Sequence, residues 1–117
     1  MFDHEKLHVY QLSITFTTWV YRHCYRLRGP DIHIRDQLIR SAQSIPLNIA
    51  EGNGRPPSAD RVRFFRIALG STFESAAALD ILKASGTLPP SVEDEGKEML
   101  VRTASMLYKL TKRKSSG

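Results

Sequence analysis

The stretch from residue 31 to residue 52 reads DIHIRDQLIRSAQSIPLNIAEG. At roughly 100° per residue its apolar side chains recur on one side, which is the pattern of an amphipathic helix. Pro46 lies inside this stripe and lacks a backbone N–H, so we expect a kink near residues 42–45. The side chains that we expect to form the buried stripe are Ile34, Leu38, Ala42, Ile45 and Ile49.

A polar ribbon runs beside that stripe, at steps of three or four residues. Buried polar groups need hydrogen-bond partners, and Glu74, further along the chain, is spaced to pair with Arg40. We therefore interpret the ribbon as an internal polar network that sets helix register, or as an oligomer contact, with an active or ligand site as the alternative. The network residues are Gln37, Arg40, Ser44, Asn48, Glu51 and Glu74.

Outward from this stretch, glycine and proline divide the chain of 117 residues into segments that suit helices. Ser58 is the expected N-cap of the third segment, and Ser91 with Asp94 has capping-box spacing at the start of the fourth. The sequence predicts an all-α, antiparallel up-down-up-down four-helix bundle that forms a single domain over residues 1–117. The expected helices span about 4–28, 31–52, 58–85 and 91–113, followed by a basic tail over 112–117.

Two of the expected helices have more apolar surface than one core can bury. In the first, residues 13–20 have strand-like propensity, but the apolar spacing is helical. Because the first and third helices each carry a second apolar side, we expect self-association. The expected interface residues are Tyr10, Ile14, Tyr21, Tyr25, Phe65, Leu69 and Phe73.

The formal charge of +5 is concentrated in the middle of the chain. Between Arg22 and Arg66 there are nine basic residues, all arginine, against four acidic ones. The guanidinium group suits phosphate, so this segment is a candidate nucleic-acid surface, although a solvated basic face is the simpler alternative. The candidate contacts are Arg22, Arg26, Arg28, Arg55, Arg61, Arg63, Arg66, Lys112, Arg113 and Lys114.

Composition excludes several classes of protein. The longest stretch without a charged residue, 7–21, is too short for a bilayer span, so we expect no membrane association. The N-terminus, MFDHEK, does not resemble a signal peptide, and a single cysteine forms no intrachain disulfide, so a cytoplasmic location is expected.

Candidates for catalysis and metal binding are few. His4 and His8 could share a helix face but have no third ligand, and His23 falls on the apolar side of its helix. Cys24 has arginines nearby but no base partner, and the turn 52–55 lacks the residues of a phosphate-binding loop. We therefore expect no enzymatic activity, no metal and no cofactor.

Two blocks of the sequence resemble those of a known family. Residues 37–52 resemble the signature QLxRAAxSIxxNIAEG of bacterial four-helix-bundle proteins first noticed as reading frames within intervening sequences of 23S rRNA genes. Residues 64–74, FFRIALGSTFE, are similar to the second block, FLxIAxGSxxE, and the spacing between the blocks matches. The chain departs from the family at Ser41 and Phe73, both of them changes in packing.

The resemblance carries its own expectations. It implies a four-helix bundle that assembles as a ring, typically a homopentamer. It also implies kinship with the accessory variability proteins of diversity-generating retroelements, which bind nucleic acid and a reverse transcriptase. The family has no established enzymatic activity.

Three functions remain open at this point. The leading hypothesis is a non-enzymatic oligomeric bundle that binds RNA or DNA through its arginines. The second is a protein–protein interaction scaffold with no nucleic-acid role. The third is a small enzyme that uses Arg40, Asn48 and Glu51 in an open cleft.

Overall fold

The structure is a computed structural model that describes residues 2–113, and within them the fold is all-α, with four α-helices and no strand. Two short 3-10 helices precede α1 and α2. In chain order the elements are η1 (Asp3–Lys6), α1 (His8–Cys24), η2 (Gly29–Asp31), α2 (Ile32–Asn53), α3 (Ala59–Ala84) and α4 (Pro90–Arg113).

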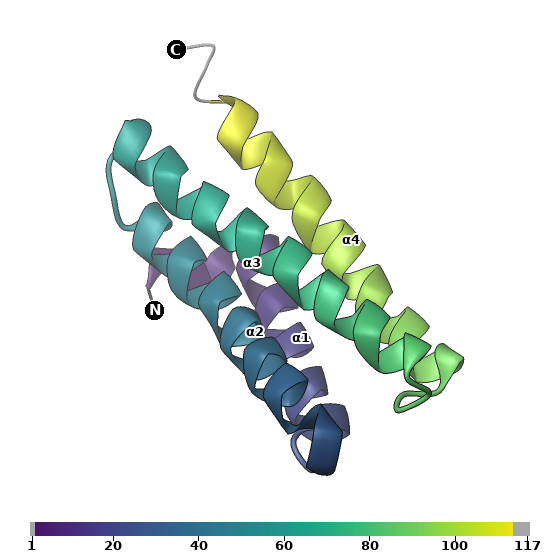
Figure 1. Cartoon of the computed structure of the whole chain (residues 1–117). Coiled ribbons are helices and arrows are strands. Elements are labelled where there is room, and N and C mark those ends of the chain that lie inside the picture. Colours follow the sequence, from purple (N-terminus) through teal and green to yellow (C-terminus); the bar gives the residue numbers. More distant parts are fainter. Residues whose placement is uncertain (1, 114–117) are drawn as a thin grey trace.

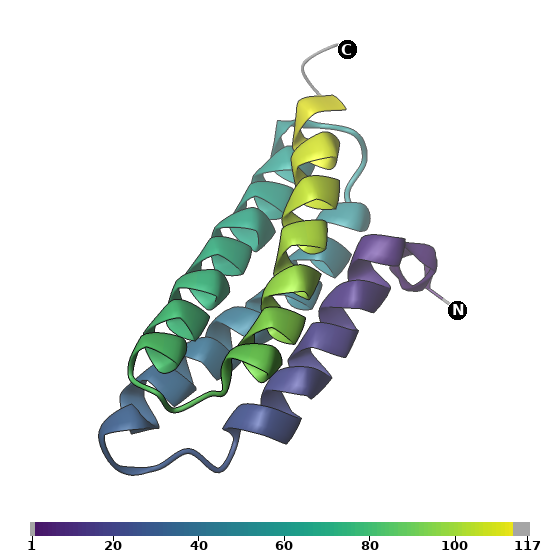
Figure 2. The same cartoon turned by 90° about the vertical axis from the view of Figure 1, so that its right-hand side faces the viewer.

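The four helices lie side by side in an elongated molecule of 47 × 27 × 22 Å (Figures 1 and 2). Helix α2 packs on α1 and α3, and α4 packs on α3 and α1. The α1–α2 and α3–α4 connections lie at one end, where Thr87 Oγ1 donates to Asp31 Oδ2 at 3.0 Å. The α2–α3 connection lies at the other end, where Asn53 Nδ2 donates to Asp3 Oδ2 at 3.1 Å. These two ends carry most of the candidate arginines.

Helix α1 is shorter than the expected span of residues 4–28. At its start Leu7 is extended, with φ −76° and ψ 128°, which separates η1 from α1. Beyond its end Arg28 is extended and Gly29 has φ +67°, a left-handed conformation that glycine tolerates best. The chain therefore leaves the helix soon after Cys24.

The core lies along the middle of the bundle and contains the stripe predicted for α2. Leu38, Ala42, Ile45 and Ile49 are fully buried, while Ile34 is half-buried. The core is completed from the other helices by Phe16, Val20, Leu79, Leu82, Leu100 and Leu107.

Helix α2 continues through Pro46 as one helix, and the kink near residues 42–45 stays a prediction. A proline at this position leaves the carbonyl of Ala42, four residues earlier, without its helical donor. Thr17 Oγ1 on α1 lies 3.2 Å from that carbonyl oxygen and donates to it, as well as contacting Ser13 O at 2.8 Å. Thr17 on the neighbouring helix thus donates a hydrogen bond in place of the backbone N–H that Pro46 lacks.

Helix α3 buries residues from both of its apolar sides. Phe65 was expected at an outer interface but is 2% exposed, and Thr72 and Leu79 are also buried. Ile67 is 40% exposed, whereas Ala68 and Leu82 are fully buried. Because α3 has apolar residues on all sides, its periodicity does not single out the buried side.

The two expected helix caps have opposite outcomes. Ser58 caps α3 as predicted, since its Oγ accepts the Arg61 N–H at 3.1 Å. The predicted capping box of Ser91 and Asp94 is wrong, because α4 already begins at Pro90. Proline suits the first position of a helix, where no backbone donor is needed.

Glycine permits close helix contacts at two positions. A Cβ added to Gly96 on α4 would lie 2.5 Å from the Trp19 ring of α1. A Cβ on Gly52 would lie 3.0 Å from both Phe64 Cβ and the Phe65 ring. The first contact holds α1 close to α4, and the second holds the end of α2 against α3.

A buried carboxylate joins α3 to α4 near their connection. Glu93 is 2% exposed and lies 3.6 Å from Lys83 Nζ and 3.3 Å from Lys97 Nζ. Lys97 also pairs with Asp80, whose hydrogen bond is the main cause of the raised pKa of Lys97. Residue spacing did not indicate this cluster, because its members lie on two helices, α3 and α4, and come together only in the folded chain.

Candidate nucleic-acid interface

The α1–α2 end carries three of the predicted phosphate contacts. Arg22, Arg26 and Arg28 are exposed, and none makes a hydrogen bond or ion pair with any residue that the structure describes. A fourth arginine at this end is used internally. Arg35 donates from Nη1 to the carbonyls of Tyr25 and Leu27, at 3.2 and 3.1 Å, and pairs with Asp36 at 2.9 Å. Arg35 therefore holds the connection, and the three exposed guanidinium groups remain available.

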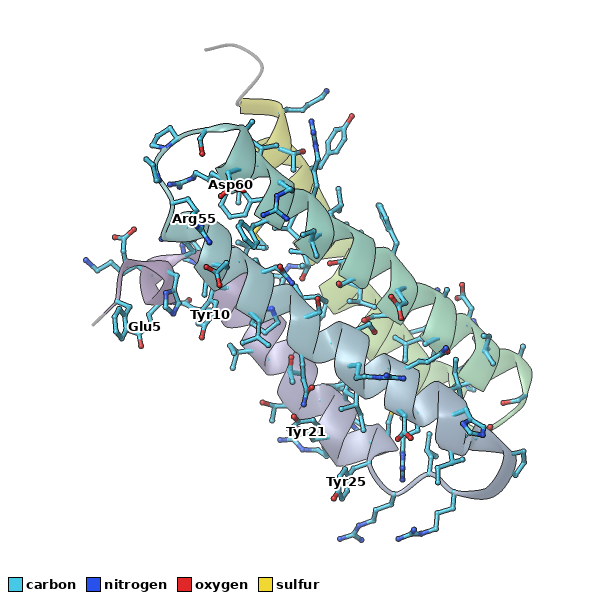
Figure 3. All side chains as sticks on the ribbon, turned by 60° about the vertical axis from the view of Figure 1, so that its left-hand side comes forward. Glu5, Tyr10, Tyr21, Tyr25, Arg55 and Asp60 are labelled. Atoms are coloured by element: carbon cyan, nitrogen blue, oxygen red, sulfur yellow. The ribbon has the colours of Figure 1, made fainter. Side chains whose placement is uncertain are left out.

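The α2–α3 end holds three more predicted contacts in a different state (Figure 3). Arg55, which Figure 3 places at this end beside Asp60, lies 3.0 Å from Glu51 Oε2 and 3.6 Å from Asp60 Oδ2. Arg63 pairs with the other oxygen of Asp60 at 3.0 Å. Two carboxylates thus neutralise two of the arginines that the sequence assigned to phosphate.

Aromatic rings complete this arginine cluster. The guanidinium carbons of Arg55 and Arg63 lie 5.0 and 4.4 Å from the centroid of the Phe64 ring. Arg61 lies over Phe65 at 5.5 Å and donates to the carbonyl of Arg55 at 2.9 Å. Cation–π contacts and charge-assisted hydrogen bonds of this kind hold side chains in place. The arginines at the α2–α3 end are consequently engaged in contacts within the fold.

The remaining predicted contacts are scattered. Arg66 on α3 is exposed and forms no ion pair with any of residues 2–113. The Lys112 ammonium lies 4.9 Å from the centroid of the Tyr108 ring. For Arg113 only the backbone is described, and Lys114 lies outside the described residues.

The predicted polar network on α2 is formed in its middle. Asn48 Nδ2 donates to Ser44 O and Oγ at 2.8 and 2.9 Å, and Ser71 Oγ donates to Ser44 Oγ at 2.8 Å. One turn away, Ser41 and Ser75 share a buried hydrogen bond of 2.7 Å between their hydroxyls. We missed this pair because serine at a buried helix position has no distinctive spacing.

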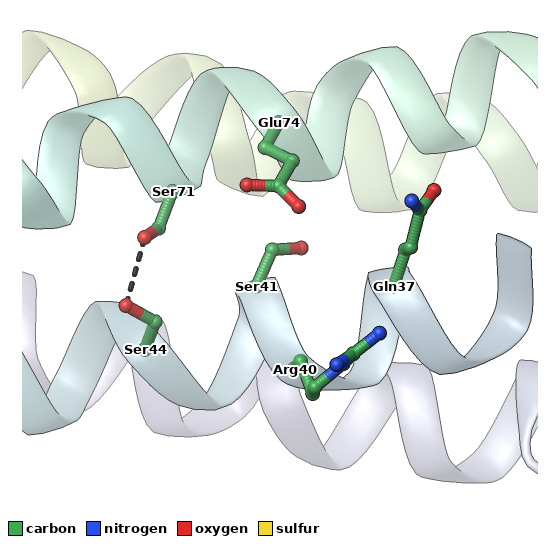
Figure 4. A pocket seen from close by; sticks show the side chains of 6 residues that line it. All are labelled: Gln37, Arg40, Ser41, Ser44, Ser71 and Glu74. Carbon is green, nitrogen blue, oxygen red and sulfur yellow. Dashed lines mark hydrogen bonds between the residues drawn. The ribbon is translucent and has the colours of Figure 1, made fainter.

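The ends of that network are open. Gln37, Arg40 and Glu74 line a groove of about 370 Å³ between α2 and α3, whose floor is formed by serines (Figure 4). The expected pair between Arg40 and Glu74 is not formed, and the two side chains lie on different sides of the groove. Glu51 instead pairs with Arg55. The internal network is therefore smaller than predicted.

The groove offers limited chemistry. Its lining combines hydroxyl, amide, guanidinium and carboxylate groups, and none of its lining residues is a histidine or cysteine. Elsewhere in the described chain, no group of three or more His, Cys, Asp or Glu side chains could hold a metal ion. Burial raises the pKa of Cys24 to about 11, so its thiol is a poor nucleophile at neutral pH.

Exposed apolar side chains occupy two further surfaces. On α1, Ile14, Tyr21 and Tyr25 are 42%, 46% and 64% exposed. On α3, Ile67, Phe73 and Ile81 are 40%, 60% and 53% exposed. Of the other predicted interface residues, Tyr10 and Leu69 are half-buried against the core. Within residues 2–113, no helix has the length and apolar character needed to cross a bilayer.

Comparison with known proteins agrees with this architecture. The chain has 19% sequence identity, with a TM-score of 0.75, to the crystal structure of a protein of unknown function from the S23 ribosomal protein family of Bacteroides thetaiotaomicron. The match covers 89% of this chain and 98% of the other and reflects the shared fold. No curated protein matches the sequence significantly. The family model for 23S rRNA-intervening sequence proteins matches residues 5–109, and the chain therefore belongs to the 23S rRNA-intervening sequence protein family.

Proposed function

We propose that this protein is a non-enzymatic, oligomeric helical bundle that binds RNA or DNA through its α1–α2 end. The observation that carries the proposal is the state of Arg22, Arg26 and Arg28, which are exposed and have no acceptor among the described residues. Guanidinium groups without internal partners are suited to phosphate oxygens. Such contacts read no bases, so binding is expected to tolerate many sequences and to weaken steeply with salt.

Self-association is the second part of the proposal. Helix α3 exposes three large apolar side chains, Ile67, Phe73 and Ile81, and exposed apolar patches commonly mark interaction surfaces. Gly70, Ala77 and Ala84 are also exposed on this helix. We propose that the bundle, an up-down-up-down unit and a single domain, assembles through this side of α3 as a ring-like homo-oligomer, with the pentamer implied by the family as the expected size.

Charge at the edge of the α3 surface supports this choice. Arg40 and Glu74 line the groove beside α3 and have no ion-pair partner within the described chain. Opposite charges at the rim of an apolar surface favour pairing with a second copy. Assembly would also repeat the α1–α2 end around the ring, and so concentrate its positive charge.

A titration of the full chain tests both parts. Filter binding with a structured RNA and with duplex DNA at low salt is expected to give dissociation constants in the micromolar range or below, at roughly 1–100 µM for sequence-independent contacts. Light scattering on the same sample is expected to give a multiple of 13.2 kDa. Absence of binding at these concentrations would refute the nucleic-acid role, and a monomer mass would refute assembly.

A protein–protein interaction scaffold is the second candidate. It is favoured by the exposed apolar side of α3, which suits another protein, such as a reverse transcriptase, as well as a second copy. Capture of one stoichiometric partner that survives nuclease treatment would support this candidate. A cytoplasmic location is proposed in either case.

A further inference from the structure

We infer that the α1–α2 end takes nucleic acid in its single-stranded form, with unpaired bases stacking on Tyr21 and Tyr25. This inference rests on the proposed nucleic-acid role and specifies the strand form that the site accepts. Tyr21 and Tyr25 are 46% and 64% exposed, although the large apolar ring of tyrosine favours burial. Figure 3 shows both on the same flank of α1, toward the end of the bundle opposite Arg55 and Asp60.

At the end of α1 the sequence contains the pair Tyr-Arg twice. Residues 21–28 read YRHCYRLR, so each tyrosine is followed directly by an arginine. Residues four apart lie above one another on a helix. Tyr21 lies in the last turn of α1, and Tyr25, its C-cap, keeps helical dihedral angles of φ −57° and ψ −33°, so the tyrosines form one ridge. Arg22 lies beside Tyr21 on the helix, and Arg26 follows Tyr25 in the turn beyond it. A strand that lies along α1 would meet rings with its bases and guanidinium groups with its phosphates.

The axial spacing favours a strand without base stacking. Four residues of helical rise place the Cα atoms of Tyr21 and Tyr25 about 6 Å apart along the axis. Successive nucleotides of a duplex strand are only about 3.4 Å apart, and their faces are covered by the neighbouring base pairs. Unpaired bases expose their faces and can spread to match the rings, which is how aromatic platforms bind single strands.

One of the two rings is held in place before any ligand binds. The Tyr21 hydroxyl accepts a hydrogen bond from Gln43 Nε2 on α2 at 2.7 Å. For Tyr25 the backbone carbonyl is held by Arg35 at 3.2 Å, which fixes the end of the helix beneath the ring. A ring that is already oriented loses less conformational entropy on binding.

The acidic groups near this ridge are engaged with other residues. On the α4 side, Glu95 Oε1 accepts the indole N–H of Trp19 at 2.7 Å and lies 3.9 Å from His23 Nε2. On the α2 side, Asp36 is paired with Arg35. Glu95 keeps its negative charge, because indole is neutral, and it lines a surface hollow together with Arg22. Arg22, Arg26 and Arg28 outnumber this carboxylate, so the α1–α2 end keeps a net positive charge.

Fluorescence anisotropy with two labelled probes tests the inference. The probes are an oligo-dT of about 20 nucleotides and a hairpin duplex of matched phosphate number. Each stacked base contributes about 1–3 kcal/mol, which corresponds to roughly 5- to 150-fold in affinity per ring. The double variant Tyr21→Ala/Tyr25→Ala is expected to lose at least about tenfold in affinity for oligo-dT and less than about threefold for the duplex.

Matched variants separate stacking from other effects. Tyr21→Phe/Tyr25→Phe keeps both rings and is expected to bind oligo-dT within about threefold of the unaltered chain. Tyr108→Ala removes another exposed tyrosine, 52% exposed on α4, and is expected to have no effect. Light scattering of the alanine double variant is expected to give the mass of the unaltered protein.

Each other outcome has a distinct meaning. Preference of the unaltered chain for the duplex, or equal binding of oligo-dT by the alanine variant, would overturn the single-strand inference and leave the proposed nucleic-acid role intact. A changed mass would show that the tyrosines form an interface between copies, and would also overturn the inference. No binding of either probe would refute the proposed function itself.

Discussion

The two ends of the bundle use the same residue type in opposite ways. At the α2–α3 end, Arg55 and Arg63 share the carboxylates of Glu51 and Asp60 and lie against the Phe64 ring. At the α1–α2 end, Arg22 and Arg26 are exposed and have no such partners among the described residues. From the sequence all four arginines are equivalent candidates for phosphate.

The difference shows that a count of basic residues does not define a binding surface. An arginine with a carboxylate at 3.0 Å must give up that partner before it can bind phosphate, whereas an unpaired one gives up only water. The position of acidic residues relative to each arginine in the folded chain therefore decides which part of the positive charge is available. Substitutions at the two ends can test this contrast.

The largest effect is expected at the contact that holds α1 on α4. Gly96→Ala would place a methyl group 2.5 Å from the Trp19 ring, and we expect a loss of about 2–3 kcal/mol in the free energy of unfolding. Displacement of α1 should also weaken binding at the α1–α2 end. Urea denaturation measures the loss, and Gly54→Ala, where a Cβ would make only ordinary contacts at 3.6 Å, is the control and should change the stability little. Equal stability of the two variants would contradict the close packing of α1 on α4.

A pair of arginine substitutions compares the two ends directly. Arg61→Ala removes hydrogen bonds to Arg55 O and Asn53 Oδ1 and the contact with Phe65, and should cost about 1–2 kcal/mol of stability. Arg26→Ala removes no internal contact and should change stability by less than about 0.5 kcal/mol. Urea denaturation gives the change in the free energy of unfolding for both variants, provided that the dependence of that free energy on urea concentration is the same in each. The assignment of roles would fail if Arg26→Ala were the more destabilising.

The cap of α3 gives a smaller effect at the α2–α3 end. Ser58→Ala removes the acceptor for the Arg61 N–H, and a loss of about 1 kcal/mol is expected. Ser58→Asp supplies another acceptor and should retain most of the stability. Thermal unfolding of both variants measures this, and an equal loss in the two would show that the hydroxyl does not act as a cap.

The smallest effect at neutral pH concerns Cys24 at the end of α1. Burial raises its pKa to about 11, so the thiol stays protonated at pH 8 and should resist alkylation in the folded chain. Because the unfolded thiol ionises near 9.0, the contribution of Cys24 to stability should be constant below that pH and should fall as the pH rises from 9.0 toward 11. Mass spectrometry after iodoacetamide treatment measures the reactivity. Rapid labelling at pH 8 without denaturant would contradict the burial.

Much of the fold could be predicted from the sequence, because local signals determine it. Glycine and proline runs mark the helix boundaries, and the apolar stripe of α2 is buried at Leu38, Ala42, Ile45 and Ile49. Helix α3 could not be oriented in the same way, because Phe65 and Ile67 are equally apolar and only tertiary packing decides which is covered. The donor that the carbonyl of Ala42 finds in Thr17 could not be predicted either, because Thr17 lies on another helix.

For the candidate site, the sequence could predict which residue types are present but not which of them pair with one another. The sequence indicates an arginine-rich region, but the pairing of Arg55 with Asp60 depends on the path of the α2–α3 connection. Likewise, Arg35 differs from Arg28 because its helix directs it toward the carbonyls of Tyr25 and Leu27. Such contacts arise between elements and have no signature in residue spacing.

The central claim is that internal pairing decides which arginines reach phosphate, and the salt dependence of binding tests it most directly. The slope of the logarithm of affinity against the logarithm of salt concentration scales with the number of phosphates that the protein neutralises, at about one per phosphate. It is also less sensitive than affinity to the carboxylates that a substitution leaves unpaired. We predict that Arg22→Ala/Arg26→Ala reduces the slope by about two, while Arg55→Ala/Arg63→Ala leaves it almost unchanged. An equal or larger reduction in the second variant would contradict the claim.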